Sequence, residues 1–206
     1  GTEGLLVQMF VPAGAKPPGG WPVVIFGHGF TDSMYGAPWT VASVFASRGI
    51  ATVSINVAGH GGGAAGTLNV LSSAGAPTVV VPAGGRGIDQ DGNGAIDSTE
   101  GVGAVGALSL VSSRDGLRQT VVDLMQLVRQ IEAGVDVDGD SSVDLDANRI
   151  YYSGQSFGGI YGTIFLGTEP SLKAGVPNVP GGSITEIARL SPNFRILTAI
   201  ALATRQ

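Results

Sequence analysis

Apolar runs with the length and composition of buried strands recur along the chain, separated by segments with a helical period. The runs at 23–26 and 50–55 are rich in β-branched residues, as is typical of strands buried on both faces of a sheet. The run at 5–11 ends at Pro12, which favours an edge strand. Further strands are expected at 78–81, 150–153 and 174–177.

The clearest helix is expected from about residue 115 to residue 133, because apolar side chains recur there at spacings of mostly three and four. These side chains are Leu117, Val121, Leu124, Met125, Val128 and Ile131. Shorter helices are expected at 38–48, 158–166, 183–190 and 194–203. Strands therefore alternate with helices, and this order predicts an α/β fold with a mostly parallel sheet flanked by helices.

The composition is that of a folded protein with many turns. Of the 206 residues, 43% are hydrophobic, 34 are glycine and only 13% are charged, so we expect one domain, or most of one, with ordered loops. The net charge of −5, with no cluster of Lys and Arg, gives no electrostatic basis for nucleic-acid binding. The absence of cysteine excludes disulfides, cysteine-ligated zinc and a thiol nucleophile.

Nothing in the chain is long and apolar enough to predict a transmembrane segment. The chain opens with Gly1 rather than Met, and a processed or trimmed N-terminus is the simplest account.

Ser156 is the strongest candidate for a catalytic residue. It lies in Gly154-Gln155-Ser156-Phe157-Gly158, between an expected strand and an expected helix, which is the setting of a nucleophile elbow, G-x-S-x-G. The flanking glycines leave room for a strained turn that pushes the serine hydroxyl out of the sheet. The alternative is a serine that merely fills a tight turn. A serine nucleophile also needs a base, and the two histidines, His28 and His60, both precede Ser156.

A second motif, Gly27-His28-Gly29-Phe30, follows the buried strand at 23–26. Together with the elbow it resembles the α/β-hydrolase family, in particular secreted bacterial lipases and esterases. Similar segments lie at 56–61, 114–123 and 178–182, so the resemblance covers roughly residues 5 to 182. It implies that residues 1–206 are the N-terminal part of a single α/β-hydrolase domain, and that the protein is secreted or lies in the cell envelope.

The resemblance also implies a chemistry, in which the Ser156 hydroxyl attacks the carbonyl of a small-molecule or lipid ester. The backbone N–H of Phe157 and, most simply, that of Phe30 would bind the oxyanion, although the register at Phe30 could slip by one residue. His28 and His60 would be structural. Competing interpretations are an amidase or acyltransferase with the same machinery, and a non-catalytic, calcium-stapled binding module on a hydrolase fold.

The catalytic groups expected of this family are incomplete in the sequence. The family order is serine, acid, histidine, but after Ser156 the chain offers the acids Glu169 and Glu186 and no histidine. The resemblance implies further strands after Val176 and places the acid and the histidine on the loops that follow them. We therefore expect a C-terminal portion, as a second polypeptide packed against the Val176 strand, to supply both groups. The alternative is a truncated chain without activity.

Two acidic stretches, at about 84–100 and 135–147, are predicted to be calcium-loop insertions. The first matches D-x-[DN]-x-[DN]-G-x5-E at every fixed position, and calcium prefers such oxygen ligands. The alternative is a solvated acidic loop, but so many carboxylates in twelve residues would repel one another without a cation. The predicted ligands are Asp89, Asp91, Asn93, the Ala95 carbonyl, Asp97 and Glu100.

The second stretch repeats this pattern imperfectly. Ser141 replaces the turn glycine, Ala147 stands where the glutamate should be, and Asp146 is the candidate to replace that glutamate. A calcium ion here would be structural, because the loop leads into the strand before Ser156. The predicted ligands are Asp136, Asp138, Asp140 and Asp144.

Overall fold

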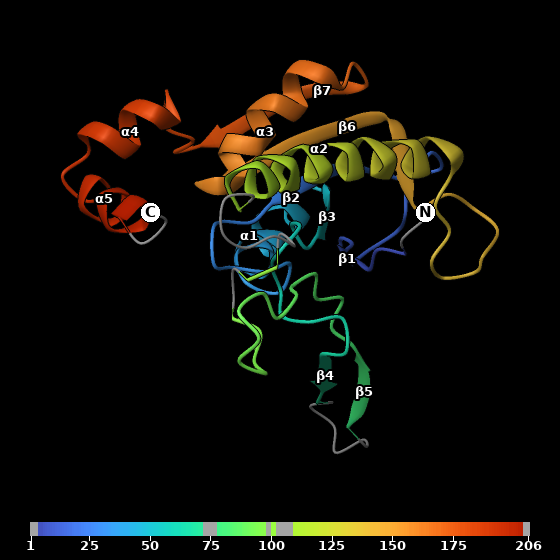
Figure 1. Cartoon of the computed structure of the whole chain (residues 1–206). Helices are drawn as coiled ribbons and strands as arrows, with labels where there is room; N and C mark the ends of the chain where they lie inside the picture. Colours follow the sequence, from blue (N-terminus) through green and yellow to red (C-terminus); the bar gives the residue numbers. More distant parts are fainter. Residues whose placement is uncertain (1–3, 72–77, 98–99, 102–108, 204–206) are drawn as a thin grey trace.

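A five-stranded sheet in the order β1-β3-β2-β6-β7 forms the centre of the molecule (Figure 1). The computed structural model describes residues 4–71, 78–97, 100–101 and 109–203. The strands are β1 Val7–Phe10, β2 Trp21–Gly27, β3 Ala51–Ile55, β6 Leu145–Gln155 and β7 Leu172–Asn178. β2, β3, β6 and β7 pair in parallel, whereas β1 pairs with β3 in the antiparallel direction at the edge. The predicted fold, a mostly parallel α/β sheet, is confirmed.

Helices cover both faces of this sheet. On one face lie α2 Ser109–Ala133 and α3 Phe157–Thr168. The predicted apolar side chains of α2, including Leu124 and Val128, pack there against alternate side chains of the central strands. On the opposite face, Phe45 of α1 Ala37–Ala46 lines one groove with Val24 of β2. Runs that are apolar at every position fit strands covered in this way, and each residue of β3 is buried.

Most boundaries lie within about two residues of the sequence prediction, and two differ more. α2 begins at Ser109, and β6 begins at Leu145, where Leu145 pairs with Trp21 across a register shift. The sequence does not predict the start of β6, because Asn148 and Arg149 interrupt the apolar pattern. Both side chains are exposed.

A two-stranded antiparallel ribbon, β4 Thr67–Val70 with β5 Val79–Pro82, projects from the sheet (Figure 1). β5 was predicted, whereas β4 was not, because its four residues include the polar Thr67 and Asn69. Exposed apolar side chains on the ribbon include Val70, Val79 and Val80.

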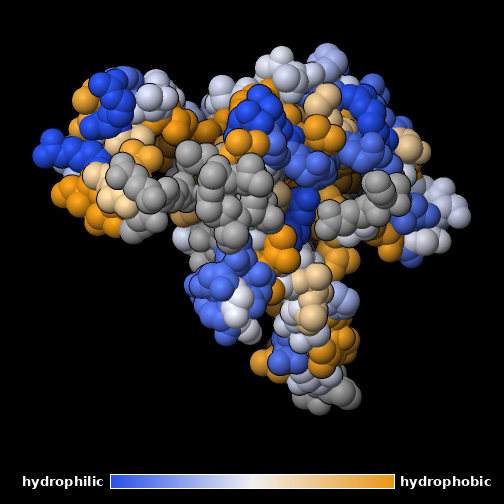
Figure 2. All heavy atoms as spheres, viewed as in Figure 1, coloured by the Kyte–Doolittle hydropathy of each residue, from blue (hydrophilic) through white to orange (hydrophobic). Residues whose placement is uncertain are grey.

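The predicted helices after β7 are present as α4 Ile184–Leu190 and α5 Arg195–Ala203. They contact each other, and none of their described side chains is buried. Figure 2 shows apolar side chains gathered over this part of the surface, at the left. Exposed apolar residues there are Leu190, Phe194, Ile196, Leu197, Ile200 and Leu202. Among the described helices, none combines the length and apolarity needed to cross a lipid bilayer.

Candidate active site

Ser156 lies between the end of β6 and the start of α3, in the strained turn that the motif predicts. Its φ of 54° and ψ of −112° lie in a region that serine rarely adopts, at a cost of about 1–3 kcal/mol. Two backbone hydrogen bonds hold the turn: the Ser156 N–H donates to the Asn178 carbonyl at 2.9 Å, and the Ile160 N–H donates to the Ser156 carbonyl at 3.0 Å. The neighbouring strand β7 therefore helps to fix the serine.

The two motif glycines are required by close backbone contacts. A Cβ on Gly154 would lie 2.5 Å from the Gly158 carbonyl oxygen, and a Cβ on Gly158 would lie 2.1 Å from the Gly27 carbonyl oxygen. Neither position has room for a side chain, because both contacts are with backbone. The elbow thus packs directly against the end of β2, where the second motif begins.

Two buried tyrosines connect these segments, and the sequence analysis did not identify them. The Tyr152 hydroxyl donates to the Gly158 carbonyl at 2.5 Å, and the Tyr161 hydroxyl donates to the His28 carbonyl at 3.2 Å. Burial raises the pKa of both phenols, so each stays protonated and keeps donating. A tyrosine within a buried strand, or on the buried face of a helix, needs a hydrogen-bond partner for its hydroxyl. The positions of both tyrosines in such segments could therefore have predicted this role.

The segment after β2 reaches Ser156. A Cβ on Gly29 would lie 3.9 Å from the Ser156 Cβ, in ordinary van der Waals contact. The rings of Phe30 and Phe157, whose N–H groups are the predicted oxyanion donors, lie 5.5 Å apart between centroids. Phe30 is 58% exposed, which places it at the surface of the site. The structure thus brings the two residues together beside the serine, and their donor role stays a prediction.

Asn56, which follows the buried strand β3, holds the loop after Phe30 in place. Its Oδ1 accepts a hydrogen bond from the Met34 N–H at 2.9 Å, and its Nδ2 donates to the Gly84 carbonyl at 2.8 Å. The loop contains Thr31 at a φ of 68°, a second strained position close to the site. A buried asparagine directly after an apolar strand was a signal that the sequence analysis did not use.

Both histidines are buried and bonded to backbone, as the resemblance implies. The His28 Nε2 accepts a hydrogen bond from the Val57 N–H at 3.1 Å, which leaves Nδ1 to donate to the Gly29 carbonyl at 2.9 Å. Burial lowers the pKa of His28 to about 4. The His60 Nδ1 lies 3.3 Å from the Ala58 carbonyl oxygen, and burial lowers its pKa also. Neither imidazole hydrogen-bonds to Ser156 among the described contacts, so neither is placed as its base.

The two acids that follow Ser156 in the sequence are engaged elsewhere. Glu169 lies just beyond the far end of α3, where both carboxylate oxygens pair with the Arg129 guanidinium and one accepts from the Ser171 N–H. Glu186 lies on the exposed helix α4 and pairs with Arg189 at 3.0 Å. Within the described residues, neither acid and neither histidine is hydrogen-bonded to the candidate nucleophile Ser156.

Acidic loop 1, residues 89–100, brings Asp89, Asp91 and Glu100 together, with one oxygen of each within 4.8 Å of the others. Asp97 and Ala95 lie in the loop but outside this group. Glu100 accepts hydrogen bonds from the Gln90 N–H at 2.6 Å and from the Asp91 N–H at 3.0 Å. Asn93 accepts from the Ala95 N–H at 2.8 Å. The loop is shaped by its own side chains, and calcium binding stays a prediction.

Acidic loop 2, residues 136–144, brings Asp136, Asp138 and Asp144 together in the same way. The replacement for the missing glutamate is Asp144, which accepts a hydrogen bond from the Val137 N–H at 2.7 Å as Glu100 does from Gln90. Asp146, the candidate from the sequence for this place, lies outside the group. Asp146 bonds to Arg149 at 2.5 Å and to the Asn148 N–H at 2.8 Å, because it already lies on strand β6.

Comparison with solved structures shows the fold. Est1E from Butyrivibrio proteoclasticus with bound ferulic acid is 20% identical, with a TM-score of 0.51, over 90% of this chain and 52% of that one. The acetyl xylan esterase from Paenibacillus sp. R4 is 22% identical, with a TM-score of 0.50, over 84% of this chain and 43% of that one. The chain thus spans about half the length of these structures or less. No protein-family model matches the chain, and no curated protein matches its sequence.

Proposed function

We propose that this chain, which has the α/β-hydrolase fold, supplies the nucleophile and the oxyanion site of a serine hydrolase that cleaves carboxylic esters. The observation that carries the proposal is the placement of Ser156. Its strained turn lies at the carboxyl end of β6, in contact with the Gly29–Phe30 segment that follows β2. Ligands bind at this edge of parallel α/β sheets, because the loops that follow neighbouring strands meet there.

The chemistry follows from the geometry and from general principles of acyl transfer. The Ser156 Oγ attacks the ester carbonyl while a base accepts its proton, and a tetrahedral oxyanion forms. Donors such as the Phe157 and Phe30 N–H groups stabilise that oxyanion, each by about 3–4 kcal/mol. Departure of the alcohol leaves an acyl-serine, and attack by water then releases the acid and restores Ser156.

A cavity of about 460 Å³ beside the site has space for part of a small ester. Thr31 and Gly61, the residues directly after Phe30 and His60, belong to its wall, and Tyr35 and Ser33 add hydroxyl groups. The names of the two similar structures, an acetyl xylan esterase and a protein with bound ferulic acid, fit small carboxylic acyl groups. We keep a small-molecule ester as the leading substrate class and a lipid ester as the alternative.

The acid and the base are proposed to come from a further portion of the protein that packs against β7. His28 bonds to backbone through both ring nitrogens and His60 through Nδ1, and neither is hydrogen-bonded to Ser156 in the described contacts, so the proposed base is a third histidine. In the described sheet β7 is an edge strand, and beside it lies an apolar groove of about 320 Å³, whose walls include Val24, Phe45 and Val176. A segment packed there would bury Val176, which is 65% exposed.

The proposed calcium ion is structural and lies in loop 1; in loop 2, predicted from the sequence as the weaker site, the Lys16 ammonium contacts the same carboxylates and would compete with a metal ion. Exposed loops with several carboxylates suit the millimolar calcium found outside cells, where sites of low affinity are filled. An extracytoplasmic location, secreted or in the cell envelope, is proposed on the same ground.

A covalent serine probe on the complete protein tests the proposed function. A fluorophosphonate should label wild-type protein at Ser156, and it should not label the Ser156→Ala variant. Parallel assays with matched ester and amide substrates then distinguish an esterase from an amidase. Absence of labelling in a folded, complete protein would favour the non-catalytic binding module instead.

A further inference from the structure

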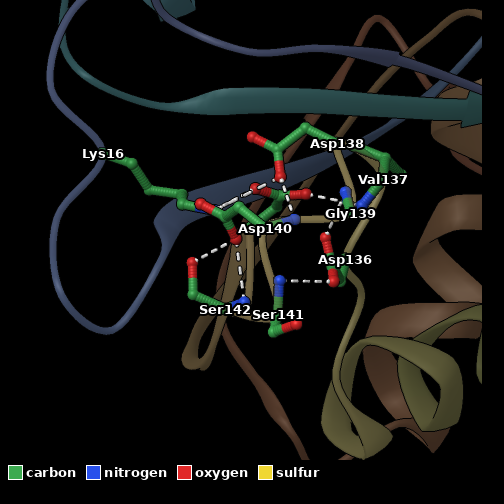
Figure 3. Close-up of polar contacts among 9 residues, drawn as sticks. Lys16, Asp136, Val137, Asp138, Gly139, Asp140, Ser141 and Ser142 are labelled. Carbon is green, nitrogen blue, oxygen red and sulfur yellow. Dashed lines mark hydrogen bonds and ion pairs between the residues drawn. The ribbon is translucent and has the colours of Figure 1, made fainter.

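The Lys16 ammonium lies among the carboxylates of loop 2 (Figure 3). Its Nζ is 2.7 Å from Asp144 Oδ1, 3.1 Å from Asp140 Oδ2 and 3.9 Å from Asp138 Oδ1. The Lys16 side chain is only 19% exposed and that of Asp144 only 6%, so this contact is partly shielded from water. One ammonium group therefore contacts three of the four acidic side chains of loop 2 that were predicted to bind calcium.

The two acidic loops share the contacts of their first aspartate, whereas the contact with a lysine is seen in loop 2. Both use their first aspartate to accept from two later N–H groups: Asp89 from Gly92 and Gly94, and Asp136 from Gly139 and Ser141. The chain contains two lysines, and the other one, Lys173, lies on β7. Among the described residues no lysine contacts loop 1, whereas Lys16 lies within 3.9 Å of three carboxylates of loop 2.

Lys16 also connects loop 2 to the start of β2. Lys16 belongs to the segment 13–20, which precedes that strand. The last residue of this segment, Gly20, packs so closely against β6 that an added Cβ would lie 2.7 Å from the Leu145 backbone. The Trp21 N–H donates to the Asp144 carbonyl at 2.8 Å. β2 and β6 begin at this point, and their opposite ends carry the Gly29–Phe30 segment and Ser156.

We propose that Lys16 is the built-in cation of loop 2. Its ammonium takes the position that a divalent ion would need, so the loop keeps its shape, and joins the starts of β2 and β6, without bound metal. In loop 1 the described residues include no lysine contact of this kind, so loop 1 is the loop whose order would depend on an added cation. The carboxylates raise the pKa of Lys16, chiefly through its hydrogen bond to Asp144, so the side chain stays charged over the whole physiological range.

The test replaces Lys16 with methionine, which has a stem of similar length and no charge. Asp89→Asn with Glu100→Gln first removes two predicted calcium ligands of loop 1. Binding of terbium, a luminescent substitute for calcium, then reports on loop 2. In this background Lys16→Met should lower the melting temperature in chelator, and calcium should largely restore it. Terbium affinity should rise about tenfold or more, because the competing cation is gone.

Lys173→Met in the same background is the matched control and should change neither quantity. The proposal is overturned if Lys16→Met has the melting temperature and terbium affinity of this control. It is also overturned if Lys16→Met fails to fold with calcium as well as without it, since the metal would then not replace the ammonium. These readouts do not depend on hydrolytic activity.

Discussion

At the residue scale, the conformation of Ser156 depends on neighbours far away in the sequence. Gly154 and Gly158 leave room for the turn, but Asn178 on β7 accepts the Ser156 N–H, and the Gly27 carbonyl packs against the glycine that follows. A strained residue persists only where its surroundings determine its conformation, and here three strands contribute. This placement separates Ser156 from Ser153, which lies within β6 and whose hydroxyl donates to the Val176 carbonyl at 3.4 Å.

Replacement of Ser156 by alanine in the complete protein should lower kcat for ester hydrolysis by at least about a thousandfold, because no acyl-serine can form. The melting temperature should stay within a few degrees of wild type, since only the hydroxyl is lost. Ser153→Ala is the control and should keep most of the activity. Wild-type turnover by the Ser156→Ala variant would exclude the assignment.

His28 should make stability depend on pH in a defined range. Its pKa is about 4 in the folded protein and about 6.5 in the unfolded chain, so the unfolded state binds the extra proton first. The contribution of neutral His28 is therefore complete above about pH 6.5 and is lost as the pH falls towards 4, by at most about 3 kcal/mol.

Denaturant unfolding between pH 7 and pH 4.5, together with an NMR titration of the imidazole, measures this effect. His28→Gln should show a flatter dependence over the same range, although His60, whose pKa is also lowered, contributes to the remaining slope. An NMR pKa near 6.5 for His28 would contradict the assignment of both its nitrogens to backbone groups.

At the scale of elements, the two acidic loops are the least regular parts of the fold and yet have repeated local structure. In loop 1 the side chain of Glu100 accepts hydrogen bonds from the N–H groups of Gln90, Asp91 and Asp97, so residues near both ends of the loop meet at one carboxylate. Burial cannot stabilise this arrangement, because most of the loop is exposed. The proposed calcium ion would instead stabilise it by balancing the negative charge of the carboxylates.

Calcium in excess should therefore raise the melting temperature of the wild-type protein relative to chelator, by an amount that grows with calcium concentration. At a hundred times the dissociation constant the expected gain is about 2.7 kcal/mol. Asp89→Asn with Glu100→Gln should abolish most of this gain, whereas Asp115→Asn, on the exposed surface of α2, should preserve it. Identical melting curves with calcium and with chelator would count against a site in loop 1.

At the scale of the whole molecule, the buried and exposed apolar surfaces are unevenly distributed. Between α2, α3 and the sheet, large side chains such as Tyr161 and Phe165 are completely or almost completely buried. Beyond β7 the opposite holds, since α4 and α5 expose most of their apolar residues and Val176 faces the open groove. Apolar surface of this extent is typical of an interface, and the proposed portion with the acid and the histidine would cover it.

Replacement of Val176 by aspartate should therefore weaken the association of that portion and lower hydrolytic activity in the complete protein by about tenfold or more, because a carboxylate would be buried without a partner. Val122→Asp is the matched control, because Val122 is similarly exposed, at 56%, on the outer side of α2. Full activity of Val176→Asp, or full ester hydrolysis by the 206-residue chain alone, would refute the proposed arrangement.

The sequence by itself determined the alternation of strands and helices, the elbow around Ser156 and the repeated acidic pattern. These features are local: a strand buried on both faces needs a continuous apolar run, and a strained turn needs small neighbours, so a few adjacent residues specify each one. The limits of local reasoning appear at β4 and at the start of β6, where polar side chains interrupt the pattern and pairing with another strand decides the structure.

Only the tertiary structure decided which side chains serve the site and the loops. Tyr161 reaches a carbonyl 133 positions away, and Lys16 reaches a carboxylate 128 positions away, and no local period encodes such a meeting. In loop 2 the structure groups the carboxylate of Asp144, and not that of Asp146, with those of Asp136 and Asp138. Asp146 is already committed to β6, and the backbone of Asp144 is held by Trp21. The contacts of Tyr161 and Lys16 depend on hydrogen bonds and ion pairs between residues far apart in the sequence, and residue type alone does not predict them.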